Sequence, residues 1–141
     1  MNNKDMISST GFREIPHTAD CEIEVWAPDI SSLFICAAQG MYALSGINLK
    51  GSPPIRREIT FSGIDPEYLL VCFLSELLYL SEEKNEGFDH FGIDIDGTNL
   101  RVIMEGSPVK TTHRNIKAVT YHDIMIRYDA CGYHVNIVFD V

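Results

Sequence analysis

Residues 65–82, Asp-Pro-Glu-Tyr-Leu-Leu-Val-Cys-Phe-Leu-Ser-Glu-Leu-Leu-Tyr-Leu-Ser-Glu, contain the clearest fold signal in the chain. Asp65 is a residue type that caps helix N-termini, and Pro66 follows it at the first helical position, where proline is best tolerated. Apolar residues then recur at helical spacing and form a wide stripe of Leu69, Leu70, Phe73, Leu74, Leu77 and Leu78. This stretch predicts a deeply packed helix that ends near Glu82.

The flanking sequence predicts a second helix and several strands. Asp29 is placed to cap a helix over residues 31–44, where apolar residues recur every three or four positions. Alternating apolar and polar residues predict strands, and two turn-rich tetrapeptides predict hairpins. The strands cover residues 12–15, 21–27 and 56–61, the hairpins join 91–95 to 100–104 and 117–128 to 133–139, and a polar loop covers 106–115.

Two helices with hairpin-linked strands indicate an α+β fold. We expect a single domain with a mostly antiparallel sheet and two main helices. The domain is expected to cover residues 12–141, after a flexible N-terminal tail over residues 1–11.

The composition argues against several classes of function. The 141 residues carry a net charge of -9. Sequence-independent nucleic-acid binding depends on Lys and Arg, so we expect no strong direct binding of nucleic acid, and a basic partner or a metal is easier to accommodate. The longest apolar stretch, residues 68–80, is interrupted by Ser75 and Glu76 and is too short for a bilayer. The N-terminus shows no signal-peptide pattern, and the cysteines are scattered along the chain without a pairing motif. We therefore expect a cytoplasmic protein without a membrane segment.

Two stretches bring carboxylates and a histidine into candidate positions. Residues 17–20, His-Thr-Ala-Asp, lie between two predicted strands, so that His17 and Asp20 can point at one site. Residues 138–141 are strand-like to the last residue, where Asp140 stands beside the terminal carboxylate. An all-oxygen ligand set suits hard cations such as Ca²⁺ or Mg²⁺. Each stretch alone also fits local turn chemistry at Asp20 and a solvated terminus without metal.

A third stretch, residues 117–123, reads Lys-Ala-Val-Thr-Tyr-His-Asp. Strand alternation would place Lys117, Val119 and Tyr121 on one face and His122 on the other. Lys117 could balance a carboxylate cluster, and His122 could be a ligand, a general base or an ordinary hydrogen-bonded side chain. The sequence contains no GxSxG, HExxH or P-loop motif.

Together the three stretches resemble the signatures of the archease family. Residues 17–20, leading into Ile-Glu-Val-Trp at 23–26, resemble its N-terminal signature, and residues 116–122 resemble its second signature. The ending Val-Phe-Asp-Val resembles the family's closing Asp-plus-aliphatic terminus. The resemblance implies a non-catalytic cofactor of the GTP- and manganese-dependent RNA-splicing ligase, which joins tRNA halves and repairs RNA ends. Such proteins promote guanylylation of the ligase and its multiple turnover.

The resemblance also implies roles for individual residues. Asp20, Asp140 and Val141 match the family's metal-binding positions, with Ca²⁺ as the expected ion and Mg²⁺ or Mn²⁺ as alternatives. Lys117 matches a functionally important lysine, and His17 matches a motif histidine to which we assign no role.

The chain departs from the family pattern before the lysine motif. Ser107 stands where an acid is common, Asn115 stands near a frequent Glu, and the loop over residues 109–116 is short. If the missing acids support the metal, its binding is weaker here. If they contact the ligase, the partner match is specific to this lineage.

Two other functions stay open at this point. Some archease-like proteins are linked to a tRNA cytosine methyltransferase, as chaperone-like modulators of its specificity. The other alternative is a small metal-dependent hydrolase that uses Asp20, Asp140, His17 and His122, and it would need an open metal position and a base within reach.

Overall fold

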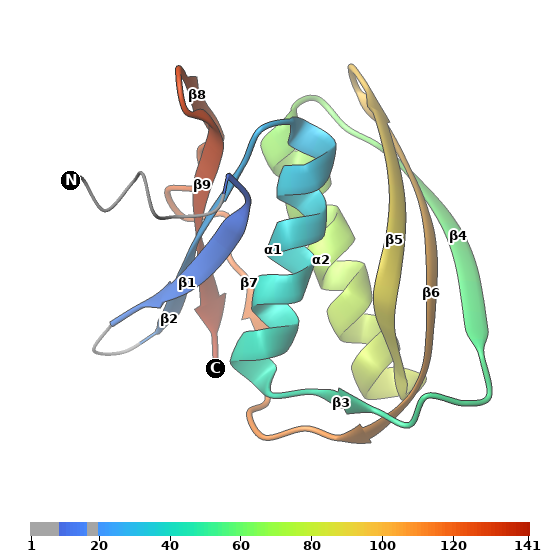
Figure 1. Cartoon of the computed structure of the whole chain (residues 1–141). Helices are drawn as coiled ribbons and strands as arrows, with labels where there is room; N and C mark the ends of the chain where they lie inside the picture. The colour runs from blue at the N-terminus through green and yellow to red at the C-terminus, as the bar shows by residue number, and fades with distance from the viewer. Residues whose placement is uncertain (1–8, 17–19) are drawn as a thin grey trace.

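The computed structural model describes residues 9–16 and 20–141, and in it two antiparallel sheets enclose two helices (Figure 1). The first sheet, called the β9 sheet here, consists of β1 (Gly11–Ile15), β2 (Cys21–Ala27), β9 (Gly132–Asp140) and β7 (Ala118–Val119) in that order, and β8 (Arg127–Asp129) also pairs with β9. The second, the β6 sheet, has the order β3 (Asn48–Leu49), β6 (Asn99–Thr111) and β4 (Ile55–Ser62), and β5 (Glu86–Asp96) pairs with β6.

The two helices begin where the sequence predicts. In α1 (Ile30–Ser45), the Asp29 carboxylate accepts a hydrogen bond from the Ser32 backbone N–H at 2.8 Å. In α2 (Pro66–Glu83), Asp65 accepts from the Tyr68 N–H at 2.8 Å. Each aspartate satisfies a backbone donor that has no partner inside the helix. Gly46 ends α1 in the left-handed conformation, with a φ of 66°.

The core lies on both sides of the helix layer. Phe34 of α1 stacks on Phe73 of α2, with ring centroids 6.2 Å apart. Buried side chains of the β9 sheet, such as Ile137, and of the β6 sheet, such as Val102, complete the same cluster. The prediction of a single α+β domain with mostly antiparallel pairing and two main helices is therefore confirmed. Neither helix combines the length and apolar character needed to span a bilayer.

The predicted polar loop over residues 106–115 is wrong, because β6 continues to Thr111. Gly106 lies against the backbone of Gly87 on β5, where a side chain would not fit. The hydroxyl of Ser107 is buried and accepts a hydrogen bond from the Gly51 N–H at 2.8 Å. Gly and Ser therefore occupy a tightly packed strand here, although both residue types are typical of turns.

The predicted strand over residues 117–128 is also wrong, because only its two ends are strands. The ladder of β7 stops at Val119, and Asp123 adopts a positive φ of 55°. The backbone N–H of Ile126 then bonds to the carboxylate of Glu67 on α2 at 2.9 Å. Val119 is buried while Lys117 and Tyr121 are exposed, so the expected common face of these three residues does not form.

Candidate functional site

Three neighbouring strands of the β9 sheet end at one corner of the molecule. Cys21, the first residue of β2, pairs with Phe139 of β9, and Ala118 of β7 pairs with Asp140 on the other side of that strand. The backbone N–H of Lys117 donates to the Asp140 carbonyl at 2.7 Å. Asp20 directly precedes β2, so segments far apart in the sequence bring Asp20, Lys117 and Asp140 to the same corner.

The side chains at this corner face solvent. Asp20, Lys117 and Asp140 are exposed, and Val141 is 37% exposed. Among the residues that the structure describes, no ion pair joins Lys117 to either aspartate. His17 lies outside the described residues. The corner therefore gathers two carboxylates and a cation on a backbone frame, with their side chains open to solvent.

Buried neighbours fix the frame beneath these exposed residues. Phe139 is fully buried, and Ile116 and Val119, on either side of Lys117 and Ala118, are also buried. Asp140 and Lys117 are thus joined directly to residues that cannot move without disturbing the core. The hydroxyl oxygen of Thr120 is buried and has no hydrogen-bond partner in the described part of the chain.

The corner offers an oxygen-only ligand set. Within residues 9–16 and 20–141, no three His, Cys, Asp or Glu side chains come together as a metal site. The two aspartates are hard oxygen donors, and their exposure leaves room for water as further ligands. This donor set fits Ca²⁺, Mg²⁺ or Mn²⁺ better than it fits zinc.

His122 does not share in a cluster of this kind. Its side chain is 80% exposed and lies 3.0 Å from the carboxylate of Asp123, the next residue. An exposed local pair on an irregular segment gives no support for a general base held against a metal. The hydrolase alternative therefore gains nothing from the geometry of the described residues.

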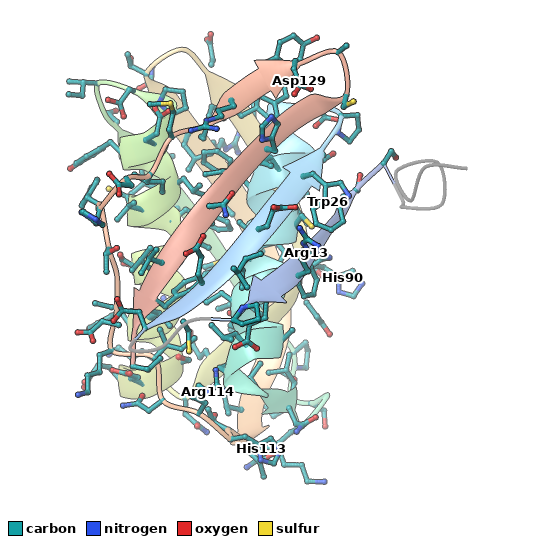
Figure 2. The ribbon with its side chains drawn as sticks, turned by 90° about the vertical axis from the view of Figure 1, so that its left-hand side faces the viewer. Arg13, Trp26, His90, His113, Arg114 and Asp129 are labelled. Atoms are coloured by element: carbon teal, nitrogen blue, oxygen red, sulfur yellow. The ribbon has the colours of Figure 1, made fainter. Side chains whose placement is uncertain are left out.

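Arg114 is a charged residue near the corner that no sequence motif singles out. Its guanidinium donates to Cys21 Sγ at 3.0 Å and lies 3.5 Å from the Glu14 carboxylate (Figure 2). Its own backbone N–H and that of His113 both donate to the Ser45 carbonyl at the end of α1. Only the folded chain brings residue 114 next to residue 21, so no local sequence signal could have identified it.

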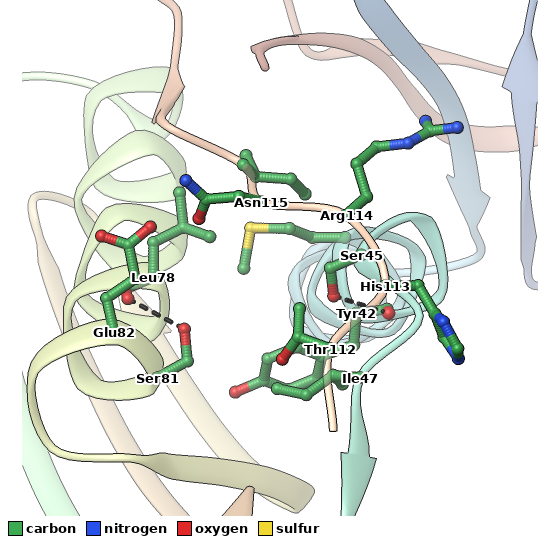
Figure 3. Close-up of a pocket in the computed structure, with 12 residues that line it drawn as sticks. Tyr42, Ser45, Ile47, Leu78, Ser81, Glu82, Thr112, His113, Arg114 and Asn115 are labelled. Atoms are coloured by element: carbon green, nitrogen blue, oxygen red, sulfur yellow. Dashed lines mark hydrogen bonds between the residues drawn. The ribbon is translucent and has the colours of Figure 1, made fainter. Parts of the chain in front are cut away.

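A pocket of about 360 Å³ lies beside the segment that leads to Lys117 (Figure 3). Met41, Tyr42 and Leu78 supply apolar surface, and Glu82 and Asn115 supply polar groups. Figure 3 shows the side chains of His113 and Arg114 directed away from it. A second pocket, of about 310 Å³, includes Glu22, Arg127, His134 and Asn136.

Comparisons with known proteins agree on one family. The model of the Archease protein family matches residues 12–141. An archease of Methanosarcina barkeri is 30% identical over 96% of this chain and 100% of its own length. An archease of Sulfurisphaera tokodaii is 29% identical over 92% of this chain and 98% of its own length.

Two solved structures share the fold. The solution structure of protein 1598 of Methanobacterium thermoautotrophicum has a TM-score of 0.70 at 24% identity, covering 93% of this chain and 99% of that one. The crystal structure of an archease from Thermotoga maritima, described as a possible chaperone, has a TM-score of 0.67 at 22% identity. It covers 92% of this chain and 96% of that one.

Proposed function

This chain belongs to the archease family, and from that premise we propose that it is a non-catalytic protein cofactor of a GTP-dependent RNA-splicing ligase. It promotes guanylylation of the ligase and its multiple turnover in tRNA splicing and RNA repair. The observation that carries the proposal is the strand register that collects Asp20, Lys117 and Asp140 at one exposed corner. The family resemblance singles out these three residues together with His17 and Val141.

A divalent cation, Ca²⁺ with Mg²⁺ and Mn²⁺ as alternatives, is part of the proposal. Asp20, Asp140 and the carboxylate of Val141 would hold it, and its charge would offset their mutual repulsion. The residues themselves do the remaining work. Asp20 and Asp140 present acceptors to the partner, and Lys117 supplies a positive charge beside them. None of these groups needs to move a proton, which agrees with a cofactor rather than an enzyme.

The test is a ligase assay with single-residue variants. We expect Asp140→Ala, Asp20→Ala and Lys117→Ala each to lower ligase guanylylation and multiple-turnover ligation at least tenfold, on the order of 1.4 kcal/mol or more. Melting should change little, because all three side chains are exposed. Asp94→Asn is a matched control, since Asp94 is an exposed aspartate on β5, in the other sheet. Full stimulation by both aspartate variants would contradict the proposal.

A second candidate rests on the description of the Thermotoga maritima protein as a possible chaperone. In that case the chain modulates a tRNA cytosine methyltransferase and the metal is structural. Asp20→Ala and Asp140→Ala would then lose thermal stability and partner binding together. Loss of ligase stimulation with unchanged melting would favour the ligase instead.

A further inference from the structure

One side of α2 is not covered by either sheet. Tyr68, Cys72, Glu76 and Tyr79 follow one another at intervals of four, four and three residues, so they share one face of the helix. Tyr68 is 40% exposed and Tyr79 is 49% exposed. The buried residues of α2, including Leu70, lie on its other faces.

The irregular segment between β7 and β8 widens this face. It runs along α2 at the left of Figure 2, and the bond from Ile126 to Glu67 attaches it to the helix. The ring of Tyr121 stacks on that of Tyr68, with centroids 6.2 Å apart and an interplanar angle of 29°. Tyr121 and Met125 are 52% and 56% exposed.

Cys72 lies beside both stacked tyrosines. A hydrogen bond with Cys72 raises the pKa of Tyr68. The pKa of Tyr121 is raised mainly by burial, and the neighbouring Cys72 and Tyr68 raise it further. Both phenols therefore stay neutral well above neutral pH. Their rings form an uncharged aromatic platform.

Exposed apolar and aromatic residues gather on this side. In the described chain, eight large side chains of this kind are exposed, and five of them lie here: Ile64, Tyr68, Tyr79, Tyr121 and Met125. Ile64 belongs to the group because the adjacent Gly63 packs against the ring of Tyr68. We call these five residues and Cys72 the tyrosine surface. A concentration of this kind marks an interaction site more often than scattered single residues do.

The charges near the tyrosine surface are mixed, with acids in the majority. Asp65 and Glu76 belong to α2 and its cap, Asp123 lies between Tyr121 and Met125, and Arg127 lines a pocket with Met125 and Asp123. The chain as a whole carries a net charge of -9. The nearest arginine on β4, Arg57, is already bound to Glu86 by two hydrogen bonds. Phosphate backbones and a second copy of this acidic chain would both be repelled.

An arginine side chain can interact both with the exposed tyrosine rings and with the acidic groups near them. Its planar guanidinium stacks on tyrosine rings and pairs with carboxylates in fixed geometry. We propose that the tyrosine surface docks an arginine-containing basic segment of a partner protein, with guanidinium groups stacked on Tyr68 and Tyr121. The surface shares no residue with the Asp20–Asp140 corner, so this role is additional to the ligase activation proposed above.

The test titrates the full chain with synthetic peptides and follows backbone amide shifts by NMR and affinity by calorimetry. The probe is a short peptide of alternating Gly and Arg, compared with peptides that carry Lys or Glu in place of Arg. We expect the Arg peptide to bind most tightly, with shift changes centred on α2 and residues 121–126. The double variant Tyr68→Ala with Tyr121→Ala should weaken binding about tenfold. It removes two cation–π contacts, and each exposed contact contributes about 0.5–1 kcal/mol.

Three controls keep the outcome specific. Tyr68→Phe with Tyr121→Phe retains both rings and should bind within about twofold of the wild type. Tyr128→Ala removes an exposed tyrosine on β8 whose ring packs against Tyr133 of β9, and should leave binding unchanged. Circular dichroism must show that each variant folds.

Several results would overturn the inference. One is equal binding of the Arg peptide by the double alanine variant, which would reflect only attraction to an acidic chain. Others are tighter binding of single-stranded RNA than of the Arg peptide, and a dimer in sedimentation that the double alanine variant dissociates. No ligase is present in these measurements, so they can fail or succeed independently of ligase stimulation.

Discussion

Gly106 of β6 lies directly against the backbone of β5. A Cβ atom at this position would overlap the carbonyl of Gly87 and lie 2.7 Å from the Phe88 Cα. These are backbone atoms, so no side chain can rotate to make room. The pairing of β5 with β6 shifts register between Phe88 and His90, directly beside this contact.

Gly106→Ala should therefore destabilise the protein strongly. We expect a loss of more than about 2 kcal/mol in the free energy of unfolding, measured by urea denaturation. Gly92→Ala on β5 is the matched control, because its nearest neighbour would be the Ile103 carbonyl oxygen at 3.8 Å. It should be neutral or raise stability by up to about 1 kcal/mol. Equal effects of the two substitutions would contradict this explanation.

At the scale of single elements, both helices were predictable from local chemistry. Asp29 and Asp65 cap them as expected, and the apolar stripes define their buried faces. The two hairpin turns also form where turn residues predict them, at residues 96–99 and 129–132. Signals of this kind depend on residues close together in the chain.

The elements that the sequence did not predict depend on distant partners. β6 passes through Gly106 and Ser107 because β5 and Gly51 accommodate them. After β7 the chain turns between Tyr121 and Ile124, and Glu67 on α2 then holds Ile126. The sequence marked Asp20, Lys117 and Asp140 as candidates, but it did not show how they are arranged. The register of β2, β9 and β7 brings them to one corner. The tyrosine surface combines α2 with residues 121–125, and no sequence pattern joins them.

The N-terminus of α1 gives a test at this scale. Asp29→Ala removes the acceptor for the Ser32 N–H and for the Ser32 hydroxyl, at 2.8 and 3.0 Å. We expect it to lower the free energy of unfolding by about 1 kcal/mol. Asp29→Asn keeps an acceptor oxygen, so it should lower the free energy of unfolding by only a few tenths of a kcal/mol. If asparagine costs as much as alanine in thermal or urea unfolding, the hydrogen bond is not the cause.

The whole molecule buries two weakly acidic groups in its helix layer. Burial raises the pKa of the Cys36 thiol from 9.0 to about 11. Burial also raises the pKa of the Tyr42 hydroxyl, which accepts a hydrogen bond from the Phe88 N–H. Both groups are neutral in the folded protein over a range in which the unfolded chain ionises them.

This burial predicts a loss of stability in alkali. Between pH 9 and pH 11 the unfolded chain loses the Cys36 proton while the folded chain keeps it. The folded state then binds more protons, so the free energy of unfolding falls as pH rises. Urea denaturation across this range should show this fall in the free energy of unfolding. Cys36→Ala should reduce the fall at the lower pH values, while the fall at the higher pH values should remain because of Tyr42. A free energy of unfolding that stays constant in the wild type would contradict the prediction.

At the same scale, the molecule carries two separate exposed features. One is the corner with Asp20, Lys117 and Asp140, and the other is the tyrosine surface on α2. In both features, exposed side chains are attached to backbone that buried neighbours hold in place. Single substitutions of these side chains should therefore alter partner binding without unfolding the chain. This separation allows each feature to be removed while the other serves as an internal control.

The most direct measurement of the central claim is multiple-turnover RNA ligation by the ligase of the same organism, with this protein added below the ligase concentration. We predict many product molecules per ligase with the wild-type chain, and a return to the unstimulated level with Asp140→Ala at unchanged melting temperature. Equal product formation with the wild type, with Asp140→Ala and with no added protein would contradict the account.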